Sequence, residues 1–299
     1  MFPIIPANSA SGTRTDNSQG IFGFGTPSTA VTNLVSNTGV VATDTAGVGT
    51  ARSYAAGCEY GGDKGIFGFS SSVDQTNLVS NTGVVAADTA GVGTNRSNAG
   101  ATEYGFDKGI FAYGNNGGNY SLSNLVSNTG VMGSDVTGVG TARYGSAACS
   151  YGENKGIFAY GNASGQQNMS NLVSSAGVVG TDVTGVGTAR SYLAACEYGF
   201  DKGIFGYGNT TTDTSITNLV SNTGVVATDT AGVGLTRQLL TACEFGGDKG
   251  IFGFGFDTSG AGVNVSTTNL VSNTGVVATD TSGVGTGRRA AGACSFGTA

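Results

Sequence analysis

Short apolar runs recur along the chain and are separated by clusters of Gly, Asn, Asp and Thr. In residues 190–237, for example, apolar and β-branched runs of five to seven residues alternate with such clusters. No stretch keeps apolar residues at a spacing of three and four positions for long enough to predict a helix. The pattern therefore predicts short β-strands, four in each stretch of this kind.

The pattern returns in six copies. Its clearest marker is KGIFGYG at residues 202–208, and its relatives lie at residues 20–25, 64–70, 108–114, 155–161 and 249–255. The isoleucines of successive copies are 45, 44, 47, 47 and 47 residues apart. A period of this length is typical of propeller blades or of helical solenoid units, and the predicted strands favour blades.

The two ends of the chain carry complementary parts of one repeat. Residues 20–25 form a second strand without a first, and residues 288–297 form a first strand without a second. We expect the C-terminal strand to complete the N-terminal blade, which leaves no open sheet edge between blades. The predicted fold is an all-β, six-bladed β-propeller of four-stranded blades at residues 19–299, preceded by an N-terminal arm at residues 1–18.

Turn and packing residues can be assigned within one repeat. Gly224 ends the sequence Asn-Thr-Gly, where a three-residue hairpin needs a positive φ. The chain has no Trp, so we expect blade packing to depend on Phe205, Tyr207, Leu219 and Val226 and their counterparts.

These residues carry a family resemblance. With Arg190, the Gly-rich run at residues 202–208 and the run NLVSNTG at residues 218–224, the chain resembles the kelch-type β-propeller, in which an Arg precedes the inner strand and a Gly-rich second strand follows. It departs from that pattern where Gly206-Tyr207-Gly208 replaces an adjacent Gly pair and where the fourth-strand Trp is absent.

A second resemblance concerns function. The Gly-rich repeats are similar to those of proteins from marine bacteriophages, and residues 4–10 are similar to the start of some phage tail-associated proteins. This resemblance implies a virion component, by analogy alone and without indicating a site.

Charge and hydropathy limit the classes of partner that we expect. The chain has 13 Lys and Arg against 19 Asp and Glu, a net charge of −6, and no basic run, so we expect no nucleic acid as a partner. No apolar run reaches the length of a membrane span, and residues 1–12 lack the features of a signal peptide. We therefore expect synthesis in the host cytoplasm and no membrane insertion, and the phage resemblance implies a final location in the virion.

The cysteines occupy one repeated position, six residues after the Arg of their repeat. We expect buried free thiols rather than disulfides, because equivalent atoms of neighbouring blades should lie too far apart to bond. A metal ring is disfavoured because the chain has no His and no closely spaced Cys pair. We expect no metal and no cofactor. The five positions are Cys58, Cys149, Cys196, Cys243 and Cys294.

Two carboxylates also repeat. An Asp before each Gly-Val-Gly turn is expected to accept hydrogen bonds from that turn or to meet the Arg eight residues later, with too few ligands for calcium. A Glu follows the Cys position in four copies, in one of which that position is Thr102, and on a strand the Glu faces the opposite side from the Cys position. We expect it to pair with the Arg of its repeat rather than to form a ligand site in the channel. The Glu residues are Glu59, Glu103, Glu197 and Glu244.

Catalysis receives little support. The absence of His removes the usual general base, and a glycosidase needs two carboxylates set apart from others that are distributed once per blade. We therefore expect a protein that is not an enzyme.

The linker between the second and third strands changes from copy to copy. Such loops carry recognition more often than cores do, although neutral drift of tolerant loops explains the variation equally well. Their Asn, Gly, Ser, Thr and Tyr suit adaptable hydrogen bonding. The linkers are residues 26–32, 71–75, 115–123, 162–170, 209–217 and 256–267, and the candidate partner-binding residues are Asn119, Tyr120, Gln166, Gln167, Asp213 and Asp257.

The N-terminal arm is a second candidate contact. Phe2, Ile4 and Ile5 form an apolar tip outside the predicted ring. We expect this tip to dock onto another protein.

The functional hypothesis is a non-enzymatic structural or interaction module of a phage tail or fibre. It would bind a host-surface glycan or protein, or pack against other virion proteins, with several copies in a symmetric assembly as one option. The alternative is a lectin-like or carbohydrate-active propeller of a marine bacterium.

Overall fold

The computed structural model describes residues 17–70 and 73–298, and all regular secondary structure in these two ranges is β. Among the described residues, no helix long and apolar enough to span a membrane is present. The all-β class predicted from the alternating runs is confirmed.

Six three-stranded antiparallel sheets repeat one order, in which a middle strand pairs with an inner and an outer strand. The inner strands are β3 (Ala56–Tyr60), β6 (Gly100–Tyr104), β9 (Ala147–Tyr151), β12 (Ala194–Tyr198), β15 (Thr241–Phe245) and β20 (Gly292–Thr298). The middle strands are β4 (Lys64–Gly68), β7 (Lys108–Ala112), β10 (Lys155–Ala159), β13 (Lys202–Gly206), β16 (Lys249–Gly253) and β1 (Asn17–Gly23). The outer strands are β5 (Thr76–Val79), β8 (Ser123–Val126), β11 (Ser170–Val173), β14 (Thr217–Val220), β19 (Thr268–Val271) and β2 (Thr32–Val35). A separate hairpin joins β17 (Phe256–Asp257) to β18 (Val263–Asn264).

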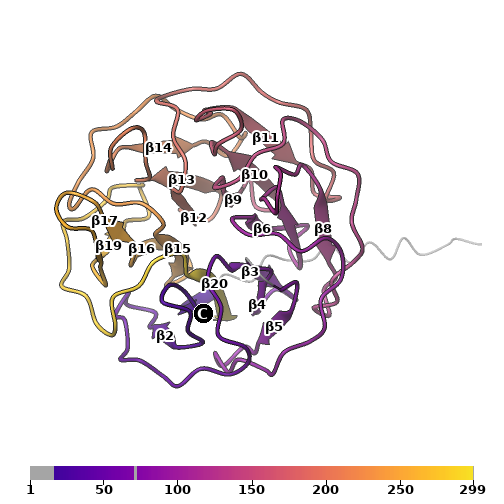
Figure 1. Ribbon diagram of the computed structural model, residues 1–299, viewed down its shortest axis with the longest axis horizontal. Helices are drawn as coiled ribbons and strands as arrows, with labels where there is room; N and C mark the ends of the chain where they lie inside the picture. Colours follow the sequence, from indigo (N-terminus) through magenta and orange to yellow (C-terminus); the bar gives the residue numbers. More distant parts are fainter. Residues whose placement is uncertain (1–16, 71–72, 299) are drawn as a thin grey trace, which may run out of the picture.

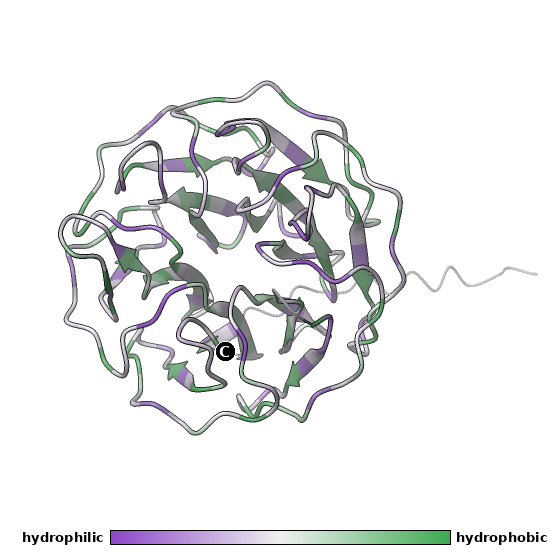
Figure 2. Ribbon diagram, in the orientation of Figure 1, coloured by the Kyte–Doolittle hydropathy of each residue, from purple (hydrophilic) through white to green (hydrophobic). Residues whose placement is uncertain are grey.

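The sheets stand side by side around a common centre (Figure 1), and each inner strand contacts the inner strands of the sheets on either side. Figure 2 shows hydrophobic residues on the strands, whereas the connecting segments are mostly neutral or hydrophilic. The hydrophobic cores lie between neighbouring sheets, where Tyr160 packs with Phe205 and Tyr207 packs with Phe252.

The fourth strand expected in each repeat is replaced by isolated bridges. After β14, only the bridges Val220↔Val226 and Thr217↔Thr230 are present. Two residues of β14 lie between these bridges, but three residues of the following segment do, so that segment bulges. The Asn218 side chain occupies this bulge and donates to the Ala227 carbonyl at 2.9 Å. The bulge interrupts the ladder, and the sheets have three strands instead of the predicted four.

The C-terminal strand β20 pairs antiparallel with β1, as expected from the complementary ends of the chain. Strand β1 begins at Asn17, inside the range predicted for the arm. The Asn17 and Ser18 carbonyls accept hydrogen bonds from Gly247 and Gly246. The arm residues Phe2, Ile4 and Ile5 lie outside the described residues.

A buried Arg joins each sheet to the one before it. The Arg190 guanidinium lies 4.1 Å from the ring centre of Tyr160 in the preceding sheet. Its Nε donates to the Tyr207 carbonyl at 2.9 Å and its Nη2 to Asn218 Oδ1 at 2.7 Å. Because φ is +65° at Tyr207, that carbonyl faces the Arg. The same stacking, at 3.9–4.3 Å, occurs at Arg52, Arg96, Arg143, Arg237 and Arg288.

The Cys and Gly of the repeat fit together across the same interfaces. All five cysteines are buried free thiols, as predicted. The Cys149 sulfur lies directly against the Cα of Gly203 in the next sheet, where a Cβ would overlap it. This contact explains why a Gly precedes the Ile in every copy of the marker and why a small residue occupies the Cys position.

The packing residues predicted for this repeat are confirmed. Phe205 and Tyr207 are fully buried, and the partly buried Leu219 and Val226 pack against the hydrophobic cores. The Tyr207 ring packs edge-to-face on Phe252 of the next sheet, with ring centres 5.2 Å apart. Gly224 has a φ of +80°, as the hairpin requires.

The repeated Asp has a different Arg partner from the one predicted. Asp229 interacts with Arg190, at the start of its own sheet, and not with the Arg eight residues later. Its carboxylate accepts from Thr188 N at 3.0 Å, Thr188 Oγ1 at 2.6 Å and Asn218 Nδ2 at 2.9 Å. Burial raises the pKa of Asp229, but these hydrogen bonds outweigh burial and set its pKa below the ordinary 3.8. The pKa is lowered in the same way at Asp44, Asp88, Asp135 and Asp182.

Candidate binding face

The variable linkers lie at one end of the sheets, which we call the loop face. Isolated bridges join the residue after the repeat's Arg to the start of a linker, as in Ser97↔Asn115 and Ser191↔Asn209. The residues just before each inner strand therefore share this face with the linkers. The opposite face carries the turns between inner and middle strands, including the Lys202 and Asp201 pair.

Hydrogen bonds connect neighbouring linkers along the loop face. Asn119 Nδ2 donates to the Ala163 carbonyl at 3.3 Å, and Gln166 Nε2 donates to the Asn209 carbonyl at 2.8 Å. The Asp213 carboxylate accepts from the backbone N and the hydroxyl of Thr258 at 3.0 and 2.7 Å. Asn264 Nδ2 donates to the Thr26 carbonyl at 3.2 Å. These bonds therefore fix the relative positions of five linkers, from residues 115–123 round to residues 26–32.

The candidate partner-binding residues divide into two groups. Asn119, Gln166 and Asp213 make the contacts between linkers just described. The other three bond within their own linkers: the Tyr120 hydroxyl donates to the Asn116 carbonyl, Gln167 Nε2 donates to the Gly165 carbonyl, and Asp257 Oδ1 accepts from Ser259 N. All six side chains support the shape of the loop face, and their contact with a partner stays a prediction.

A shallow hollow of about 80 Å³ opens at the centre of the loop face, and we call it the channel mouth. Tyr54, Asn98 and Tyr192 line its rim, and Ser146 and Leu240 are among the residues beneath them. Tyr144 packs against Tyr192 with ring centres 5.9 Å apart. The mouth thus combines aromatic rings with small apolar residues.

The backbone fixes the rim residues. Tyr192 N donates to the Gly145 carbonyl and Leu239 N donates to the Tyr192 carbonyl, both from one sheet to the sheet before it. At Gly145, φ is +63° and a Cβ would press on the Tyr192 ring at 3.0 Å, so Gly both permits the turn and leaves space for the ring. The equivalent positions all have φ between +52° and +63° and are Tyr54, Asn98, Gly145, Tyr192, Leu239 and Ala290.

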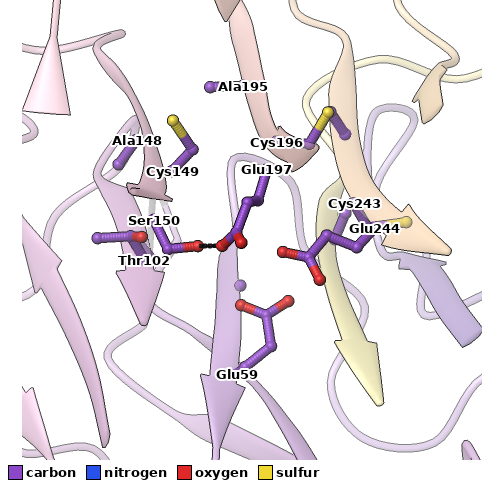
Figure 3. Close-up of a pocket in the computed structure, with 14 residues that line it drawn as sticks. Glu59, Thr102, Ala148, Cys149, Ser150, Ala195, Cys196, Glu197, Cys243 and Glu244 are labelled. Atoms are coloured by element: carbon purple, nitrogen blue, oxygen red, sulfur yellow. Dashed lines mark hydrogen bonds between the residues drawn. The ribbon is translucent and has the colours of Figure 1, made fainter. Parts of the chain in front are cut away.

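Beneath the mouth, the inner strands enclose an axial cavity of about 40 Å³. Figure 3 shows that Glu59, Glu197 and Glu244 point toward one another there, whereas the Cys196 thiol points away. Ser150 Oγ donates to the Glu197 carboxylate. The cavity is therefore strongly acidic.

The Arg expected to pair with this Glu is engaged elsewhere. Arg190 is bound to Asn218 and to backbone carbonyls, and it interacts with Asp229, while Glu197 lines the axial cavity. Among the described residues, no group of three or more His, Cys, Asp or Glu side chains is placed to hold a metal ion.

Sequence reasoning missed the rim of the channel mouth. Tyr54, Tyr144 and Tyr192 lie one or two positions after the repeat's Arg, where the copies read SY, SN, YG, SY, QL and RA. The variation of these two positions beside an invariant Arg is the feature of the sequence that could have indicated the rim. The longer variable linkers are more conspicuous in the sequence.

No protein-family model matches this chain, and no curated protein matches it.

Proposed function

We propose that the chain is a six-bladed β-propeller of the kelch type, closed between β20 and β1, that serves as a non-enzymatic interaction module. Closure is supported by the antiparallel pairing of the terminal strands and by Arg288 near the C-terminus, whose Nε donates to the Phe24 carbonyl at 2.8 Å. Asp44 in turn accepts from Thr286. The terminal sheet thus keeps most of the contacts of the others, but Arg288 Nη2 donates to the Phe22 carbonyl and not to Asn33 Oδ1, which has no partner among the described residues.

One observation carries the recognition role. Differences between the copies gather on the loop face, while the buried interfaces repeat the same Arg, Asn, Gly and aromatic residues. Hydrogen bonds between linkers hold this variable surface in one shape, and preorganisation reduces the entropic cost of binding. A preformed and locally distinct surface on a uniform scaffold suits binding to a partner.

We further propose that the module belongs to a bacteriophage tail or fibre, which the sequence resemblance supports. Strand β1 starts at the face opposite the loop face, beside the Gly246 and Gly247 turn. The residues that precede β1 include the apolar tip Phe2, Ile4 and Ile5. The start of β1, from which an arm would reach virion proteins, and the loop face, which would meet the host surface, lie on opposite faces of the module.

Quantitative mass spectrometry of purified virions tests this role. A virion component should appear at a fixed ratio to known tail proteins through successive purification steps. A chain that is lost on purification, or whose ratio varies between preparations, contradicts the virion role.

A second candidate function is a carbohydrate-active enzyme, favoured by the convergence of Glu59, Glu197 and Glu244. The axial position brings together carboxylates that the sequence distributes once per repeat. The carboxylates converge on an enclosed cavity of about 40 Å³, room for no more than a few water molecules, so a saccharide does not fit between them. Release of reducing sugar from polysaccharides, abolished in Glu197→Gln, would establish the enzyme instead.

A further inference from the structure

We propose that the channel mouth binds the terminal residue of a neutral saccharide. This inference rests on the proposed role as a recognition module and adds its ligand class. The linkers then frame the site, and the channel mouth makes the specific contacts.

The first support is the placement of aromatic side chains. Tyr54 and Tyr192 line the same hollow and come from the sheets of β3 and β12, which lie on opposite sides of the centre. Both rings are partly exposed, and their backbones are fixed by the left-handed rim positions. Rigid Tyr side chains supply a large contact surface at low entropic cost. Their faces suit the C–H face of a sugar ring.

The second support is an unsatisfied hydroxyl. Ser146 lines the channel mouth and is 6% exposed, and its Oγ has no hydrogen-bond partner among the described residues. A buried polar group without a partner is destabilising, and a hydrogen bond from a ligand hydroxyl would relieve this. The equivalent positions in the other five repeats are the apolar Ala55, Ala99, Leu193, Leu240 and Ala291.

The third support concerns charge. The residues that line the channel mouth carry no charged side chain. Ala148 and Ala195 line the acidic cavity of Glu59, Glu197 and Glu244, and they also line a hollow that shares Ser146 and Leu240 with the channel mouth. A carboxylated sugar would be repelled by this field. The site therefore selects neutral sugars.

The repeat itself supplies conservative variants. Tyr192→Asn places the residue found at Asn98 into the same backbone conformation, with φ of +57° and +54° respectively. Ser146→Ala places the residue found at Ala99, and it removes a hydroxyl that has no described partner. Both variants should fold, which circular dichroism and thermal unfolding would verify. Phe200→Asn removes an exposed aromatic side chain, also at a positive φ (+70°), from the opposite face and is the matched control.

The experiment measures binding by saturation-transfer NMR and calorimetry. The probes are methyl α-mannoside, methyl β-galactoside and N-acetylglucosamine, with N-acetylneuraminic acid and glucuronic acid as charged comparisons. We expect at least one neutral probe to bind, Tyr192→Asn to weaken it about tenfold, Ser146→Ala to weaken it about fivefold, and Phe200→Asn to leave it unchanged.

Three results would overturn the inference: no binding of any neutral probe, equal binding of the charged probes, or weakening by Phe200→Asn without weakening by the channel-mouth variants. Any of these, together with a fixed copy number in virions, would leave the virion role standing and remove only the saccharide site. Saccharide binding by a chain that is absent from virions would support the saccharide site and contradict the virion role.

Discussion

Replacing Arg190 by Met should cost about 3–5 kcal/mol of unfolding free energy. The side chain is fully buried and donates to the Tyr207 carbonyl, the Thr188 carbonyl and Asn218 Oδ1. Its removal leaves these acceptors without a donor, at about 1–3 kcal/mol for each group that water cannot reach. It also removes the stacking on Tyr160, worth about 2 kcal/mol when desolvated. Hydrophobic packing of Met recovers part of the sum.

Arg52 provides an internal comparison. Its Nη2 donates to Asn77 Oδ1 at 2.6 Å and its guanidinium stacks on Phe24, but its Nε is buried and has no partner among the described residues. Burial also lowers the pKa of Arg52 to about 10, an effect that Asp88 opposes. Since Arg52 makes one bond fewer and leaves a donor unsatisfied, Arg52→Met should cost about 1 kcal/mol less than Arg190→Met.

Urea unfolding followed by circular dichroism measures both costs, with Lys202→Met as the surface control. The Lys202 side chain is 42% exposed and pairs with Asp201, so its loss should change stability by no more than about 0.5 kcal/mol. A cost for Arg190→Met as small as that of the control, or a larger cost for Arg52→Met, would refute the reasoning that the Arg holds neighbouring sheets together.

Three further predictions follow from the same interfaces. Gly203→Ala should destabilise the protein by about 1–3 kcal/mol because the new methyl group overlaps the Cys149 sulfur. In a double-mutant cycle, Cys149→Ala in the same chain should recover part of this loss, and additive costs of the two substitutions would contradict the contact. In the other repeats a Thr donates its hydroxyl to the repeated Asp, but Leu235 occupies this position and only its backbone N donates to Asp280. Leu235→Thr should therefore stabilise the protein by about 1 kcal/mol in thermal unfolding, whereas Leu235→Val should not. Five of the repeated Asp carboxylates have a folded-state pKa below 3.8. They contribute stability that is fully present above pH 4 and is lost as the pH falls through their folded-state pKa values, so the urea midpoint should drop steeply below pH 4. A urea midpoint that stays constant from pH 5 to pH 2.5 would contradict the lowered pKa values.

The strand pattern and the position of the terminal strands were accessible from sequence because both depend on local alternation and on the repeat. The fourth strand was predicted wrongly because a bulge filled by the Asn218 side chain cannot be distinguished from a strand in an apolar run such as Val225, Val226 and Ala227. The Asp and Arg pairing was also wrong, since proximity in sequence suggested the next Arg. The structure instead brings Asp229 to Arg190, 39 positions away, at the start of the same sheet.

The channel mouth shows a different limit. Tyr54 and Tyr192 belong to separate repeats, and only the arrangement of sheets around a centre places them on one hollow. The same arrangement gathers Glu59, Glu197 and Glu244, which the sequence separates by 138 and 47 positions. Residues that look uniform along a repeat therefore become a local cluster at the axis.

Cryo-electron microscopy of purified virions tests the central claim most directly. We predict that the density shows a ring of six sheets at the tail, with the loop face and its channel mouth turned outward and the start of β1 turned toward the particle. A ring whose loop face is buried against other virion proteins, or a tail without such a ring, would contradict the proposed role.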